Sequence, residues 1–217
     1  MQSQILVEYN PVLGQFVPIT DPIRNALTAA RRAVGEDAWK RGFDPSTNQV
    51  ALKAFAQAGG SSLPIGGNLV RVYYAETKDP SGNIYRKLRL KFESKRAVIT
   101  VSLECQAEIA QRLIQMLLNV RPGEWLSLAS QTERVERNGR VFFNHIPLLE
   151  RPERRPVGIK AGLWKQAQQA ADEAVNALKG IIKNPKLLNE AAATAKVDFH
   201  VAVLREQVQP MFAAVGA

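Results

Sequence analysis

The stretch IYRKLRLKFESKR, residues 84–96, alternates apolar and polar side chains with the period of a β-strand. Its even-numbered positions include four apolar side chains: Ile84, Leu88, Leu90 and Phe92. Its odd-numbered positions begin with a ring and three cations: Tyr85, Lys87, Arg89 and Lys91. The pattern predicts a strand that buries one face in a core and carries cations around a tyrosine on the other.

The preceding stretch, NLVRVYYAE at residues 68–76, alternates in the same way, and TKDPSGN between the two has the composition of a turn. We therefore expect an antiparallel hairpin. Alternation places Leu69, Arg71 and Tyr73 on one face of the first strand, and pairing can bring Arg71 and Tyr73 beside the cations of the second strand. Residues 71–96 hold eight positive and three negative side chains.

Cations interleaved with aromatic rings are the combination that single-stranded nucleic acid requires, because cations attract phosphates and rings stack on unpaired bases. The formal net charge of +9 also favours an anionic partner. Two structural alternatives stay open. The charged face can be a solvated sheet surface that resists edge pairing, or the terminal helices can pack over it.

The rest of the chain divides into helical and β segments. QILVEY is typical of a short strand, and two helices are expected to begin at caps Asp21 and Asp44, each followed by proline. Downstream, the pattern predicts a strand at 96–104, a helix at 105–120 and a hairpin of strands 125–137 and 140–150 around Asn138-Gly139. We expect four parts: an N-terminal helical region (1–67), a β core (68–150), a basic linker (151–161) and C-terminal helices (162–217).

Three strands, one helix and two strands, in this order, are the elements of an OB-fold, a five-stranded barrel. The predicted fold class is therefore α+β, with a five-stranded OB-like antiparallel β-barrel core and helical extensions at both ends. The second hairpin reads NGRVFFNH at residues 138–145, a glycine turn followed by a basic residue, aromatic residues and an asparagine. In element order and in this motif the chain resembles the OB-fold single-stranded-DNA-binding proteins of phages and plasmids.

The resemblance implies that the first hairpin and the barrel groove bind the DNA strand. The residues that match these places are Arg71, Tyr73, Tyr85, Lys87, Arg89 and Phe143. Lys91 extends the same face, and Arg140 is the basic residue of the motif. The acidic tail that recruits partner enzymes in many of these proteins has no counterpart in REQVQPMFAAVGA at residues 205–217, so recruitment by a tail is not expected.

Signals for catalysis or metal binding are weak. His145 and His200 have no acidic neighbours at ligand spacing, and neither GxGxxG nor GxxxxGK[ST] occurs. Cys105, the only cysteine, lies among apolar residues, so we expect a buried core residue rather than a nucleophile. No cofactor or metal is expected, and no apolar run has the length of a membrane span.

The sequence therefore predicts a cytoplasmic, non-enzymatic protein that coats or protects single-stranded DNA in replication or recombination, with a mobile element as the setting that the resemblance implies. The alternative is a basic protein-interaction module, an inhibitor or assembly factor, that binds an acidic protein partner. We expect the C-terminal helices to pack on the chain's own core, and self-association into a homo-oligomer stays open.

Overall fold

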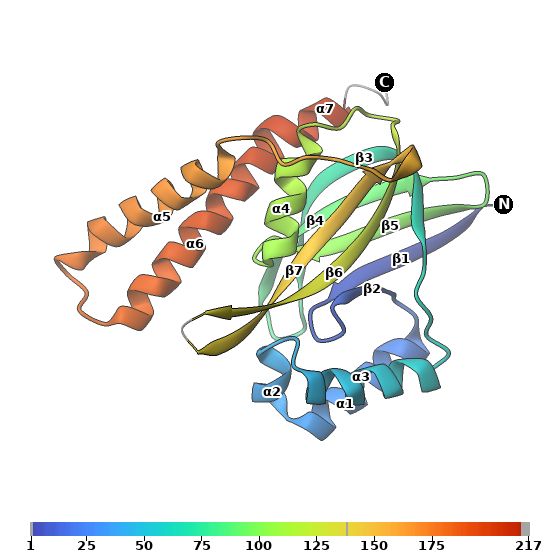
Figure 1. Ribbon diagram of the computed structural model, residues 1–217, viewed down its shortest axis with the longest axis horizontal. Coiled ribbons are helices and arrows are strands. Elements are labelled where there is room, and N and C mark those ends of the chain that lie inside the picture. The colour runs from blue at the N-terminus through green and yellow to red at the C-terminus, as the bar shows by residue number, and fades with distance from the viewer. Residues whose placement is uncertain (1, 138, 214–217) are drawn as a thin grey trace.

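The computed structural model describes residues 2–137 and 139–213, except for the side chains of Arg137 and Arg140. One sheet runs through this part of the chain in the order β2-β1-β5-β4-β3-β6-β7-β8 (Figure 1). Its strands are β1 (Ser3–Asn10), β2 (Gln15–Pro18), β3 (Ile65–Lys78), β4 (Ile84–Glu93), β5 (Ala97–Glu104), β6 (Trp125–Arg137), β7 (Arg140–Arg151) and β8 (Arg155–Pro156). The α-helices are α1 (Asp21–Val34), α2 (Glu36–Lys40), α3 (Pro45–Gln57), α4 (Glu108–Leu117), α5 (Leu163–Lys179), α6 (Pro185–Val203) and α7 (Gln209–Ala213).

Of the two predicted N-terminal helices, α3 begins at its predicted cap and α1 begins one residue early. Asp44 caps α3 by accepting backbone N–H bonds, as expected. Thr20 caps α1 by accepting from the Ile23 N–H, one residue before the Asp21 cap that we predicted. No helix within the described ranges is long and apolar enough to cross a membrane.

β3 and β4 form the predicted hairpin. Their register sets Arg71 opposite Lys91 and Tyr73 opposite Arg89. β3 begins three residues earlier than predicted. Its first four residues pair with β6, and the segment from Asn68 onward pairs with β4. The strand therefore belongs to both halves of the sheet and joins the two hairpins.

Gly67 lies where β3 passes from β6 to β4. Its φ is 153°, and a Cβ at this position would lie 2.6 Å from the carbonyl oxygen of Glu93. Such a separation is far below van der Waals contact, so the two backbones can approach this closely only at a glycine.

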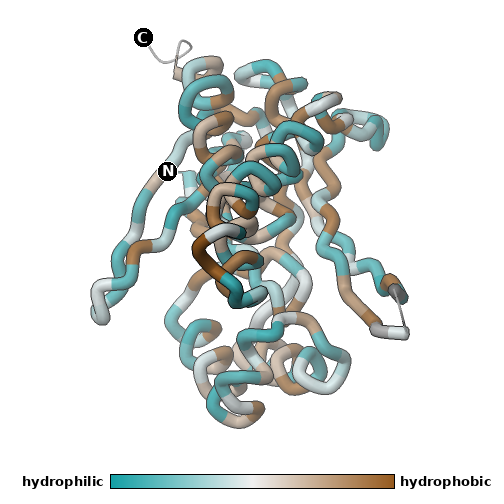
Figure 2. Tube along the Cα trace, turned by 90° about the vertical axis from the view of Figure 1, so that its left-hand side faces the viewer, coloured by the Kyte–Doolittle hydropathy of each residue, from teal (hydrophilic) through white to brown (hydrophobic). Residues whose placement is uncertain are grey.

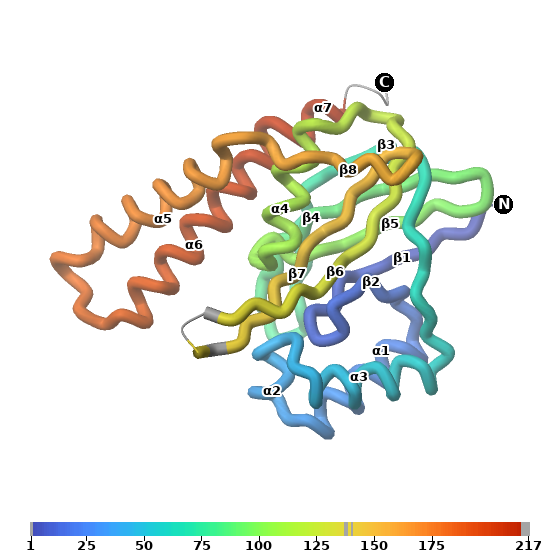
Figure 3. Tube along the Cα trace, viewed as in Figure 1, coloured from blue at the N-terminus to red at the C-terminus, as the bar shows by residue number. Residues whose placement is uncertain are grey.

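The predicted closed five-stranded antiparallel barrel is wrong, because the sheet is open, mixed and eight-stranded. β5 pairs with β4 on one side and, in parallel, with β1 on the other, so it forms no ladder with β7 in the described sheet. The turn between β1 and β2 then reaches β6, where the Ser130 hydroxyl donates to the Gly14 carbonyl at 2.9 Å (Figure 3). The N-terminal hairpin thus occupies the gap that a β5–β7 ladder would close.

One face of the sheet, which we call the inner face, is covered by α4 and the C-terminal helices. Leu88 and Leu90 of β4 share a fully buried cluster with Leu113 of α4 and Leu204, which follows α6. The end of α6 and the residues that follow it therefore pack on the chain's own core, as predicted, whereas α5 packs mainly against α6 and extends away from the sheet (Figure 1). Figure 2 shows the β3–β4 and β6–β7 hairpins on opposite sides of these helices, so the outer face of each hairpin points away from them.

Candidate nucleic-acid interface

The outer face of β3 and β4 carries the six residues predicted from the first hairpin. We call this set the cationic face: Arg71, Tyr73, Tyr85, Lys87, Arg89 and Lys91. The alternate side chains of both strands are buried on the inner face, where Val72 and Leu90 are at most 1% exposed. The prediction that these six residues share one face is confirmed, and their role in binding stays a prediction.

One residue departs from the predicted alternation. A β-bulge lies between Leu69 and Arg71, so Val70 is the extra residue of β3. Leu69 therefore pairs with Phe92 on the inner face and is 0% exposed, whereas strict alternation placed it beside Arg71. Because of the bulge, the inner face of β3 is apolar both before and after Val70.

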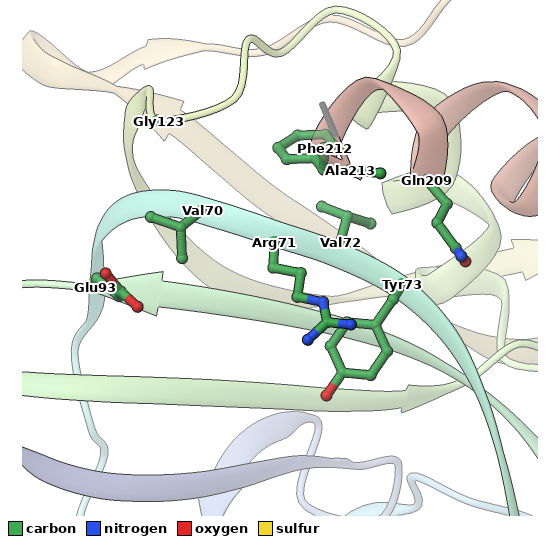
Figure 4. A pocket seen from close by; sticks show the side chains of 9 residues that line it. All are labelled: Val70, Arg71, Val72, Tyr73, Glu93, Gly123, Gln209, Phe212 and Ala213. Atoms are coloured by element: carbon green, nitrogen blue, oxygen red, sulfur yellow. The ribbon is translucent and has the colours of Figure 1, made fainter. Parts of the chain in front are cut away.

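Arg71 and Tyr73 form a preorganised pair. The guanidinium carbon of Arg71 lies 4.7 Å from the centre of the Tyr73 ring, which is the geometry of a cation–π contact (Figure 4). The pair borders a pocket of about 570 Å³ that extends to Gln209 and Phe212 of α7. Because the guanidinium occupies one side of the ring, at most the opposite side of Tyr73 is available to a base.

Tyr85 is held at the other end of the cationic face. Its hydroxyl donates to the Asp79 carboxylate at 3.1 Å, and Lys87 Nζ lies 5.6 Å from the ring centre. The hydrogen bond and the charge of Asp79 raise the pKa of Tyr85, and the positive charge of Arg31 on α1 opposes this shift. The face therefore ends beside the N-terminal helices.

Acidic neighbours neutralise part of the cationic face. Lys87 Nζ lies 3.2 Å from a carboxylate oxygen of Glu104, and Lys91 Nζ lies 2.7 Å from Glu93. Glu104 comes from β5, which the hairpin sequence does not include. The net positive charge of the face is consequently smaller than the charge of residues 71–96 suggests.

Arg71 and Arg89 take part in none of the ion pairs among the described residues. Arg89 Nε is buried without a hydrogen-bond partner, and so is the hydroxyl of Ser102, which opposes Arg89 on β5. A buried donor without a partner costs free energy that an anion can recover. Both arginines lack an acidic partner, and Arg71 is exposed whereas Arg89 is half-buried, so Arg71 is the cation of the face most available to a phosphate.

Trp125 adds a third ring to the outer face. β6 pairs Trp125 with Asn68 of β3, and the next residue, Leu126, is fully buried on the inner face. The Trp125 ring lies over Gly66, and the residue is 46% exposed. Trp125 was not among the predicted site residues, because no local signal in the sequence gives the register between β3 and β6.

Phe143 is separated from the cationic face. On β7 it alternates in step with Leu149, which is fully buried on the inner face, and its ring lies 4.9 Å from that of Phe43. The neighbouring Phe142 is 48% exposed. Arg140 is the first residue of β7, and the prediction for its side chain lies outside the described part of the structure, as does Asn138 of the predicted turn.

Cys105 is a buried core residue, as predicted. It is 0% exposed, and burial raises the pKa of its thiol to about 12, so the thiol stays protonated at neutral pH. Within residues 2–137 and 139–213, no group of three histidine, cysteine, aspartate or glutamate side chains could hold a metal ion.

Comparisons of the chain with models of protein families, with curated proteins and with solved structures find no match. The resemblance to the single-stranded-DNA-binding proteins of phages and plasmids therefore stays a prediction. The class of protein is inferred from the arrangement of the cationic face alone.

Proposed function

We propose that the chain binds single-stranded DNA along the cationic face and catalyses no reaction. The observation that supports this most is the β3–β4 register, which sets Arg71 beside Lys91 and Tyr73 beside Arg89 on the outer face. Cations and rings on one face offer contacts to phosphates and to unpaired bases at the same time. The protein would coat or protect single strands in the cytoplasm during replication or recombination, and a mobile element as the setting rests on the sequence resemblance.

The two tyrosines are placed to stack on different bases. Tyr73 opposes Arg89, and Tyr85 lies four residues along β4 from Arg89. At a rise of roughly 3.3 Å per residue the two rings are about 13 Å apart along the strand direction. This separation is too large for the rings to enclose one base, so the strand would run along the hairpin.

The salt dependence of binding tests the proposed phosphate contacts. A double variant, Arg71→Ala with Arg89→Ala, removes the two cations that have no acidic partner. We expect weaker binding to oligo-dT and a slope of log K against log salt that is smaller by about 1.4, since each lost contact to a single strand changes it by about 0.7. Fluorescence anisotropy of labelled oligo-dT across a salt series measures both quantities.

The matched control removes two charges elsewhere. Arg32 on α1 and Lys165 on α5 are exposed and take part in no ion pair among the described residues, so Arg32→Ala with Lys165→Ala changes the net charge equally. The control should keep most of the salt slope. An equal fall in slope for both double variants would show that net charge alone attracts the strand. Unchanged binding by a folded Arg71/Arg89 variant would contradict the site and favour an acidic protein partner.

A further inference from the structure

A cleft of about 620 Å³ lies away from the cationic face, on the inner side of the β6–β7 hairpin. The loop between α2 and α3, the end of β1, the start of α4 and the strand β7 form its walls. Figure 1 shows this loop beside the end of the β6–β7 hairpin. The volume is within the range of sites that bind small molecules.

Aromatic side chains form one wall of the cleft. The rings of Phe43 and Phe143 lie 4.9 Å apart with a tilt of 52°, and His145 lies edge-on to Phe43 at 6.3 Å. Phe43 and Phe143 are half-buried and both line the cleft. A wall of this kind favours a flat, aromatic ligand.

Tyr9 supplies a polar group without a partner. Its ring lies 5.7 Å from that of His145, and its hydroxyl oxygen is buried without a hydrogen-bond partner. Burial raises the pKa of Tyr9, so the hydroxyl keeps its proton and can donate it. The carbonyl oxygens and unprotonated ring nitrogens on the edge of a nucleobase are acceptors for such a donor.

Two cations line the cleft. Lys40 and Arg41 are both exposed, and Arg41 takes part in no ion pair among the described residues. The acidic groups nearby already have partners: Glu108 accepts from Arg112 Nε at 2.9 Å, and Asp44 caps α3. Lys40 pairs with Glu36 at 3.4 Å, so Arg41 is the lining cation that can bind a phosphate at the edge of the cleft.

We propose that this cleft binds a single nucleobase together with the phosphate on its sugar. The base lies against Phe43 and Phe143, its edge accepts from the Tyr9 hydroxyl, and the phosphate contacts Arg41. The ligand is either a free mononucleotide or one nucleotide of a longer strand. The site goes beyond the proposed function, because it lies on the inner side and shares no lining residue with the cationic face.

Titration of the full chain with dAMP, dTMP and inorganic phosphate, and separately with oligo-dT, tests the cleft. Phe43→Leu keeps an apolar side chain but removes the ring, and should weaken mononucleotide binding by at least about fivefold. Arg41→Ala should weaken binding of dAMP but not of deoxyadenosine. Arg32 is an exposed cation outside the cleft, so Arg32→Ala should leave the binding of dAMP and of deoxyadenosine unchanged. Tyr9→Phe should weaken base binding without lowering the melting temperature of the free protein, because the hydroxyl it removes has no partner.

The outcomes separate the two sources of the ligand and the two sites. Mononucleotide binding that falls with Phe43→Leu but not with Tyr73→Ala supports a site for free nucleotides. Loss of oligo-dT affinity in a folded Phe43→Leu variant, without mononucleotide binding, supports a site for one nucleotide of a strand. The proposal is overturned if Phe43→Leu changes the affinity for neither the mononucleotide nor oligo-dT. It is also overturned if Arg32→Ala weakens dAMP binding as much as Arg41→Ala does. The mononucleotide results do not depend on whether the cationic face binds DNA.

Discussion

Replacement of Tyr73 by alanine tests whether the cationic face stacks on bases or only attracts charge. Stacking of one base on an aromatic side chain is worth roughly 1–3 kcal/mol. The Arg71 guanidinium already lies 4.7 Å from one side of this ring, so a single base can stack on the other side. We therefore expect Tyr73→Ala to cost about 1–2 kcal/mol of oligo-dT affinity, which is a five- to thirtyfold increase in Kd.

The slope of log K against log salt distinguishes base stacking from charge attraction. Tyr73 carries no charge, and Arg71 keeps its charge when the ring is removed. The slope for Tyr73→Ala should consequently change by less than the value of about 0.7 for one lost phosphate contact. Anisotropy titration with labelled oligo-dT at several salt concentrations gives Kd and slope together, and circular dichroism with thermal melting confirms that the variant folds.

Two further variants serve as controls. Tyr73→Phe keeps the ring and should bind nearly as well as the parent. Trp164→Ala removes a ring that is also flanked by cations, since Arg112 and Lys196 each lie 6.0 Å from it, but on α5 away from the hairpin. The reasoning is refuted if Tyr73→Ala folds and binds like the parent, or if Trp164→Ala loses as much affinity.

The remaining predictions concern the core. Cys105→Ala should cost roughly 1–2 kcal/mol of unfolding free energy in denaturant titration and leave oligo-dT binding intact, because the side chain is fully buried away from the outer face; loss of binding in a folded variant would contradict this. Gly67→Ala should lower stability by more than about 1 kcal/mol in thermal unfolding, because its Cβ would meet the Glu93 backbone at 2.6 Å, and an unchanged melting temperature would disprove the close approach. Burial lowers the pKa of His200, so the unfolded chain binds a proton that the folded chain excludes. The stability from neutral His200 is present above pH of about 6.5 and is lost as the pH falls below it. His200→Gln should therefore flatten the fall in melting temperature between pH 7 and 5, and an unchanged slope would show that His200 does not titrate on unfolding.

The features of the fold that the sequence predicts are those set by neighbouring residues. Alternation and the turn at 77–83 were sufficient for the β3–β4 hairpin, and a hairpin of this kind brings Arg71, Tyr73 and the cations of β4 to one face by pairing alone. The proline that follows Asp44 marked the start of α3 for the same local reason.

The features that the sequence misses depend on distant residues. The bulge that turns Leu69 inward lies just after the segment of β3 that pairs with β6, and the sequence around Leu69 does not show this second partner. The neutralisation of Lys87 depends on Glu104, which only the β4–β5 register brings close. The element order of an OB-fold was present, but the partner of β5 is β1, and no local pattern distinguishes that pairing from barrel closure.

The parallel pairing of β1 with β5 has a consequence for how the chain folds as it is synthesised. The Ser3 hydroxyl contacts the carbonyl of Arg96, 93 residues later. At 5–20 residues per second, the ribosome needs about 5–20 s to make the chain between them. During that time β1 can pair with β2 but not yet with β5, and contacts of such long sequence separation form slowly. The N-terminal hairpin is therefore the part of the sheet most exposed to mispairing with another nascent chain, even though it is synthesised before β5.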